Sequence, residues 1–211
     1  MQREDGRTNL QHREIHIDTS KHVLFSCGLT KVHTELARAP RPGKKPLTVQ
    51  ILPSETAAPN NPSPRITRDR ENHELSLENI FTPILLDTHT YTISARVICD
   101  NGSLLSALIN SISLALVRFK VPIKHMIFST TAATSPESHN SHILDLLQSE
   151  ESSHSSLTLA IPYTKHGLGV SYAEISGPLS GRAFSDLLDF SVGRLQEVSE
   201  RIFAQAETVL K

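Results

Sequence analysis

The apolar pattern of residues 91–118 changes from a period of two to a helical period within four residues. Before the change, apolar side chains alternate with polar ones, which predicts a strand with one buried face: Tyr91, Ile93, Ala95 and Val97. After it, one face of a predicted helix carries Leu105, Leu108, Ile109, Ile112 and Leu116. The residues between, Asp100 to Ser103, predict a turn and a helix N-cap. A strand followed at once by an apolar helix indicates helices packed against sheets.

The other predicted elements are also strands and helices in mixed order. Short strands are predicted over 14–18, 22–27, 30–37, 47–52, 125–133, 157–161 and 169–175, with a hairpin turn at Gly28. A helix over about 70–86 contains Pro83, which should kink it or end its regular hydrogen bonding. A last helix over about 182–209 has a continuous apolar stripe: Phe184, Leu188, Leu195, Val198, Ile202 and Val209. This order predicts an α+β fold with mostly antiparallel sheets.

The chain of 211 residues is long enough for one substantial core, so we expect residues 1–211 to form a single domain. Residues 53–64 contain four prolines among polar residues, which predicts a flexible surface loop. Cys27 and Cys99 both lie in strand-like apolar segments, so we interpret them as core side chains. The chain has no run of 18 apolar residues and no secretory leader at Met1, so we expect a soluble protein with no membrane partner.

Charge is distributed unevenly along the chain, although the net charge is only -1. Residues 1–70 have 12 Lys/Arg and 7 Asp/Glu, and the remaining residues have 9 and 15. Seven cations cluster on two predicted loops: Arg38, Arg41, Lys44, Lys45, Arg65, Arg68 and Arg70. They are candidates for contacts with an RNA backbone, and such contacts should be independent of base sequence and sensitive to salt. The alternative is ordinary solubilising charge.

Motifs for catalysis or cofactors are sparse. The sequence lacks a P-loop, GxGxxG, HExxH, CxxC and GxSxG, and its 11 histidines are scattered, so we predict no metal and no cofactor. Asp145 and the pair Glu150/Glu151 can bind a divalent ion or act as acid and base, although such acids are more often a solvated loop edge. Ser103, at a helix N-terminus, can receive an anion, a weak signal shared by every serine-capped helix.

Several segments, in their order along the chain, resemble the RNase PH family, and within it the ring subunits of the eukaryotic RNA exosome. The opening REDGR (residues 3–7), followed by Arg13, is similar to the family's R-x-D-G-R signature. Residues 25–32 (FSCGLTKV) resemble the segment that ends in T-K-V. The strongest similarity lies across 90–125, where the matching residues are Asp100, Gly102, Ser103, Asn110, Leu114, Ala115, Leu116, Val121 and Pro122. LDLLQSEE followed by LTLAIP resembles the family's acidic strand pair.

The departures from the family pattern concern phosphate binding. Phosphorolytic members attack the 3′ end of RNA with inorganic phosphate, which a Thr/Ser and an adjacent Arg or Ser hold. Ser103 is kept here, but Leu104 and Leu105 follow it. Two arginine positions, in the preceding helix and in a Tyr-Pro-Arg at the strand entry, are also absent. Asp145 fits the first acidic position, and Glu151 stands where an aspartate would help to bind metal.

The resemblance therefore implies a non-catalytic subunit of the exosome ring, with Ser103, Asp145 and Glu151 as remnants of a site. Each lost donor should cost about 3 kcal/mol of transition-state stabilisation. The implied partners are other RNase PH-type ring subunits, cap subunits, a hydrolytic nuclease and RNA threaded through the ring. The implied location is the nucleus, nucleolus and cytoplasm. Two alternatives remain: an active phosphate-dependent 3′–5′ exoribonuclease, completed by arginines from a neighbouring subunit, and an unrelated binding domain.

Overall fold

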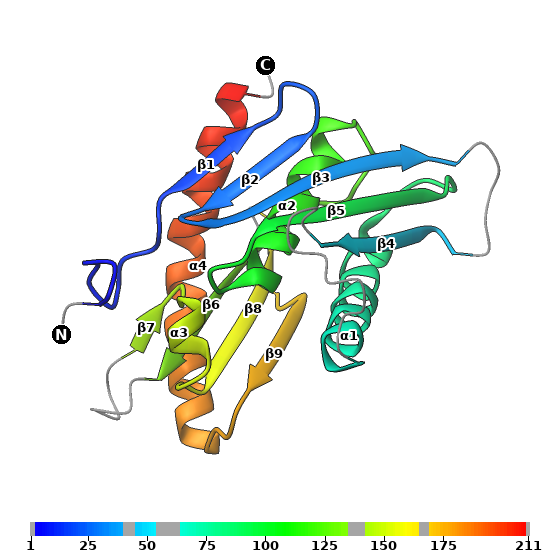
Figure 1. Ribbon diagram of the computed structural model, residues 1–211. Helices are drawn as coiled ribbons and strands as arrows, with labels where there is room; N and C mark the ends of the chain where they lie inside the picture. The colour runs from blue at the N-terminus through cyan, green and yellow to red at the C-terminus, as the bar shows by residue number, and fades with distance from the viewer. Residues whose placement is uncertain (1–2, 40–44, 54–63, 135–141, 165–168, 210–211) are drawn as a thin grey trace.

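Two β-sheets form the framework of the protein (Figure 1). The structure is a computed structural model that describes residues 3–39, 45–53, 64–134, 142–164 and 169–209. The first sheet has the order β1 (Ile15–Asp18), β2 (Val23–Cys27), β3 (Thr30–Arg38), β5 (Tyr91–Cys99) and β4 (Leu47–Leu52). The second has the order β7 (His142–Leu144), β6 (Met126–Thr134), β8 (Ser156–Tyr163) and β9 (Tyr172–Ser176). All neighbouring strands are antiparallel except β4 and β5, as expected for the predicted α+β class.

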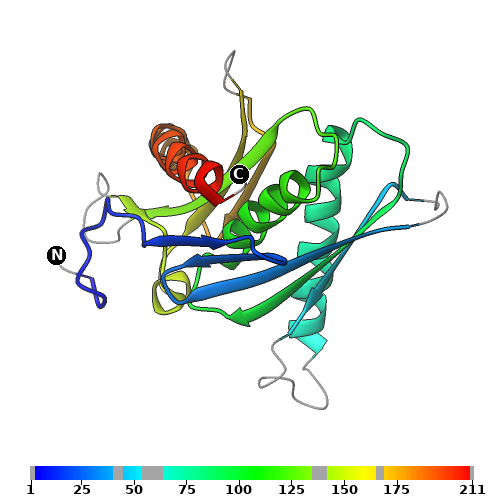
Figure 2. The same cartoon turned by 90° about the horizontal axis from the view of Figure 1, so that it is seen from above.

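The helix α2 (Leu104–Arg118) lies between the two sheets and contacts β2 and β3 on one side and β6 and β8 on the other (Figure 2). Every residue from Leu105 to Leu116 is buried, because both faces of this helix pack on a sheet. A polar residue in such a place needs partners. Asn110 finds them on β6: its amide nitrogen donates to the Ser129 carbonyl at 2.9 Å, and its amide oxygen accepts from the Ser129 N–H at 2.8 Å.

The other two long helices, α4 and α1, pack against the sheets (Figure 1). α4 (Gly181–Val209) packs along β6 and β8 and reaches β1, with Leu195, Val198 and Ile202 buried on its apolar stripe. α1 (Pro64–Phe81) lies along β4 and is followed by the 3₁₀ turn η1 (Thr82–Ile84). Pro83 lies within that turn, so the predicted end of regular helix at this proline is confirmed. None of the helices in the described ranges is long and apolar enough to span a bilayer.

Three features differ from the predictions. α1 begins at Pro64, six residues before the predicted start, because proline is favoured in the first turn of a helix and the polar residues after it carry no apolar period. The short helix α3 (Gln148–Glu151) was not predicted, whereas the strand-like segment before Asp145 does form the short strand β7. Cys27 is buried as expected, but Cys99 is exposed at the end of β5. The proline-rich loop predicted over 53–64 lies largely outside the described residues, and its last residue, Pro64, belongs to α1.

Candidate functional site

Asp145, a predicted remnant of the site, is enclosed in the protein. It follows β7 directly and its side chain is 1% exposed. Both carboxylate oxygens accept hydrogen bonds from the Arg13 guanidinium, at 2.6 and 2.8 Å, and the Arg13 backbone N–H donates a third at 2.9 Å. Burial alone would raise the pKa of this carboxyl, but His12 and Arg13 outweigh burial and hold the pKa well below its usual range. Asp145 is thus a structural group that is charged at neutral pH.

The same arginine joins three distant parts of the chain. Besides Asp145, Arg13 donates to the carbonyls of Asn101 at 2.9 Å and Gly102 at 3.0 Å, in the turn before α2. It also donates to the Thr30 hydroxyl at 3.2 Å, at the start of β3. All these contacts are buried or partly buried. Arg13 therefore fixes the turn that leads into α2 relative to the segment after β7.

The two arginines of the REDGR segment are also bound within the protein. Arg3 donates to the carbonyls of Leu144 and Asp145, both at 2.8 Å, and to Glu150 at 2.7 Å. Arg7 pairs with Asp5 at 2.5 Å and lies 3.5 Å from the Asp145 carboxylate. Since their side chains are at most 10% exposed, neither arginine is available to a substrate.

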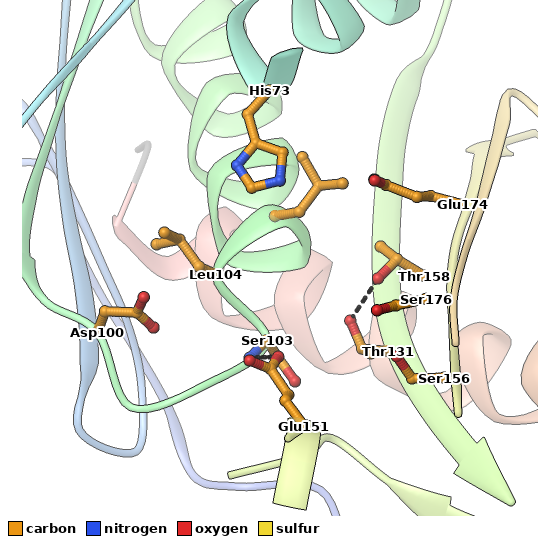
Figure 3. Close-up of a pocket in the computed structure, with 11 residues that line it drawn as sticks. His73, Asp100, Ser103, Leu104, Thr131, Glu151, Ser156, Thr158, Glu174 and Ser176 are labelled. Carbon is orange, nitrogen blue, oxygen red and sulfur yellow. Dashed lines mark hydrogen bonds between the residues drawn. The ribbon is translucent and has the colours of Figure 1, made fainter. Parts of the chain in front are cut away.

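A cavity of about 230 Å³ opens beside the first turn of α2 (Figure 3). Its acidic lining comes from Asp100, Glu151 and Glu174, and His73 reaches into it from α1. The remaining lining consists of two leucines and several hydroxyl groups: Ser103, Leu104, Leu105, Thr131, Ser156, Thr158 and Ser176. Among the residues that the structure describes, no lysine or arginine lines this cavity. The acidic side chains of the lining therefore oppose the entry of an anion such as phosphate.

Ser103 and Glu151 meet at the edge of this cavity (Figure 3). The Ser103 N–H, at the N-terminus of α2, donates to Glu151 Oε1 at 2.6 Å. Its hydroxyl donates to the Leu146 carbonyl at 3.1 Å and does not cap the helix, contrary to the N-cap prediction. Burial raises the pKa of the Glu151 carboxyl, and nearby Asp100 adds to the effect, against the hydrogen bond from Ser103. A carboxylate of the chain itself thus takes the place that an anion would occupy at this helix end.

The turn before α2 is packed closely on the segment after Asp145. Gly102 has a φ of +92°, and a Cβ there would lie 2.5 Å from the Leu146 carbonyl oxygen. Ser103 itself has a φ of 53° and Asp145 a φ of 55°, both in the left-handed region that non-glycine residues rarely adopt. The contacts of Arg13 with both segments hold this conformation.

The seven predicted RNA contacts do not form one described cluster. Arg41 and Lys44 lie outside the described residues, as does the side chain of Arg65. Arg38 ends β3 beside His89, and Lys45 pairs with Glu78 near the C-terminal end of α1 at 2.9 Å. Arg68 lies in the first half of α1, about 15 Å from Glu78 at the helical rise per residue. Residues 65–70 are helical, so their predicted place on a loop was wrong.

Sequence reasoning placed Ser103 and Glu151 together but missed their partners. His73, Thr131, Thr158 and Glu174 come from α1, β6, β8 and β9, and no local motif joins them. The pairing of Arg13 with Asp145 was also missed. One signal was available, because Asp145 is the only charged residue in the apolar run HILDLL, and a buried acid requires a cation.

Residues 12–122, more than half of the chain, match the RNase PH sequence family, described as the 3′ exoribonuclease family, domain 1. This chain belongs to the RNase PH family. Membership excludes the alternative of an unrelated binding domain. No curated protein matches the sequence.

Solved structures share the RNase PH fold with this chain. Rrp46 of rice (Oryza sativa) superposes with a TM-score of 0.77 at 22% identity, over 99% of each chain. An exosome of Archaeoglobus fulgidus with RNA bound to the active site has a TM-score of 0.67 at 18% identity, over 95% of this chain and 92% of the other. An archaeal exosome core has a TM-score of 0.68 at 16% identity, over 95% and 91%.

Proposed function

We propose that this chain is a non-catalytic subunit of an RNA exosome ring. Its ring neighbours would be other RNase PH-type subunits, and cap subunits and a hydrolytic nuclease would complete the particle. RNA would pass through the central channel for 3′–5′ processing and degradation by the nuclease. The particle would act in the nucleus, nucleolus and cytoplasm. The fold shared with rice Rrp46 and with archaeal exosomes supports this role.

One observation carries the proposal that the chain is not catalytic: the Glu151 carboxylate binds the Ser103 N–H at the mouth of an acidic cavity. Phosphoryl transfer depends on cations positioned around the phosphates. Here the nearby arginines, Arg3, Arg7 and Arg13, are engaged with carboxylates and carbonyls of the chain. Bringing phosphate beside Asp100 and Glu174 would cost free energy that no described cation in the cavity offsets.

The activity test uses the purified chain, and separately the assembled ring, with RNA and inorganic phosphate. We expect the chain alone to release no nucleoside diphosphates. Any release by the assembled ring should be independent of this cavity. The alternative, an active phosphorolytic exoribonuclease, predicts nucleoside diphosphates whose release is lost when His73→Ala changes the cavity lining, whereas Glu174→Gln, which removes a negative charge, should not lower that release. His73→Ala is a better probe than Asp145→Asn, because Asp145 is buried and structural.

Co-purification tests the ring itself. The chain expressed with the remaining ring subunits of its source should elute with them as one particle. A chain that remains alone in the presence of all the others would contradict the proposed assembly. This result is separate from the activity test. An inactive chain that joins no ring would give the expected result in the activity test and would not co-purify.

The basic residues are proposed RNA contacts within the ring. Replacing Arg38 and Lys45, or Arg68 and Arg70, by alanine should weaken RNA binding. It should also reduce the dependence of log K on log salt by about 0.7 for each phosphate that is no longer neutralised. The matched control is Arg201→Ala, an exposed cation on α4. If all variants bind RNA with equal affinity and equal salt dependence, these residues do not contact RNA and serve only as solubilising charge.

A further inference from the structure

A second group of polar side chains lies on the opposite side of the first sheet from α2. Within β3, Thr34 points to α2, where its hydroxyl lies 2.6 Å from that of Ser111. His33 and Glu35, on either side of Thr34, therefore project from the other face. Val23 of β2 pairs with Thr34, so the preceding residue, His22, lies opposite Glu35.

The three side chains converge on one point. His22 Nε2 lies 3.8 Å from Glu35 Oε1, and His33 Nδ1 lies 3.9 Å from the same oxygen. The two imidazole rings meet edge to face, with centroids 5.1 Å apart. Each residue offers one ligand atom, and all three atoms lie within 4.8 Å of one another. These separations are too long for direct hydrogen bonds, so a gap remains between the three atoms.

The geometry points to a surface site for a zinc-class divalent ion, held by His22, His33 and Glu35. Two imidazoles and one carboxylate are a common ligand set for Zn²⁺, with bonds of about 2.0–2.1 Å. Tetrahedral ligands at that distance lie about 3.4 Å apart, so each nitrogen must approach the oxygen by about 0.5 Å. Side-chain rotation supplies this movement, because the three side chains are 43%, 28% and 52% exposed.

The neighbouring charges define which ions the site accepts. Lys31 lies on the same face of β3, two residues before His33, and Arg96 of β5 pairs with His33 in the sheet. These cations disfavour Mg²⁺ and Ca²⁺, which are held mainly by carboxylate charge. Zn²⁺, Ni²⁺ and Cu²⁺ are held by imidazole, so they bind despite the cations. The solvent-facing side leaves a fourth coordination position for water or for a ligand atom from another molecule.

The second ligand group in the described residues, His12, Cys27 and Asp145, lacks this capacity. Arg13 already holds both oxygens of Asp145. Burial, with Asp145 nearby, raises the pKa of the Cys27 thiol, so the thiolate that a metal requires is disfavoured. The exposed group has neither obstacle.

Titration of the full chain with ZnCl₂ by calorimetry tests the inference, together with the visible absorption of bound Co²⁺. We expect one zinc per chain, no displacement by millimolar Mg²⁺, and an increase in Tm with zinc, since binding favours the folded state. His22→Ala and His33→Ala should each weaken binding by at least about tenfold, the loss that even an outer-sphere partner causes. Glu35→Gln should weaken it as well.

His16→Ala is the matched control, because His16 is an exposed histidine on the adjacent strand β1. It should bind zinc as the unsubstituted chain does. Circular dichroism of each variant checks its fold, and His33→Gln serves if His33→Ala is unfolded. Unchanged affinity in the His22 and His33 variants, or equal loss in His16→Ala, would overturn the site. The outcome does not depend on whether the chain belongs to an exosome.

Discussion

Arg13 and Asp145, 132 residues apart in the chain, form a paired hydrogen bond in the interior, at 2.6 and 2.8 Å. The pair connects the segment before β1 with the segment after β7, and so ties the first sheet to the second. Asp145 corresponds to the first position of the acidic pair that the family resemblance implies for the site. In this chain the acid is a structural anchor.

Asp145→Asn should destabilise the protein by about 3–5 kcal/mol, because it leaves the buried Arg13 without its counterion. Urea unfolding monitored by circular dichroism measures the change. The control is Glu197→Gln, which removes an exposed pair with Arg194 on α4 and should cost less than about 0.5 kcal/mol. Equal effects of the two substitutions would show that the buried pair contributes no more than a surface pair.

Lowering the pH should reduce the free energy of unfolding, because Asp145 becomes protonated. Its folded-state pKa lies below the unfolded value of 3.8, so its contribution is present above pH 3.8 and is lost as the pH falls through the folded-state pKa. The free energy of unfolding should therefore fall below pH 4, and it should fall less in Asp145→Asn. Unfolding curves at pH 6, 4 and 3 compare the two proteins. Parallel losses in both would assign the acid sensitivity to other carboxylates.

Glu151 should have the opposite effect on the pH dependence of stability, which the variant Glu151→Gln tests. The pKa of Glu151 is higher in the folded state than its unfolded value of 4.5. This group therefore stabilises the fold fully at pH values below 4.5, and that contribution is lost as the pH rises through the folded-state pKa. A glutamine keeps an oxygen for the Ser103 N–H without the buried charge. We expect the variant to gain stability relative to the unsubstituted chain between pH 4 and pH 7. A relative loss over that interval would contradict the sign of the shift.

Gly102→Ala should destabilise the turn before α2 by about 1–3 kcal/mol, since the new methyl group meets the Leu146 carbonyl and φ is positive. Gly193→Ala is the matched control. Gly193 lies within α4 with nothing within 4 Å of the added atom, and alanine is the better helix former by about 0.5–1 kcal/mol. Thermal unfolding should therefore move in opposite directions in the two variants.

Phosphorolytic relatives, as the resemblance describes them, hold phosphate with a Thr/Ser and an adjacent cation or hydroxyl. In this chain Ser103 is kept, while the adjacent side chains are leucine and the N–H is taken by Glu151. Three acids, Asp100, Glu151 and Glu174, line the cavity beside Ser103.

Local pattern was sufficient for most of the fold. The change of period around Asp100 predicted β5, the turn and α2, because burial on one face imposes a period of two on strands and a helical period on helices. The same rule predicted α4 from its apolar stripe. It missed α3, which is only 4 residues long and too short to show a period.

The sequence by itself determined most of the strands and helices, the Asp100–Ser103 turn and the two leucines that follow Ser103. Tertiary structure alone decided the role of the acids. Asp145 and Glu151 are six positions apart in one segment, yet Asp145 turns inward to Arg13 and Glu151 turns to Ser103. Their partners are residues more than 40 positions away in the chain. The period of an apolar pattern reports only local spacing, whereas the pKa of a carboxyl depends on which charges folding brings within a few ångströms.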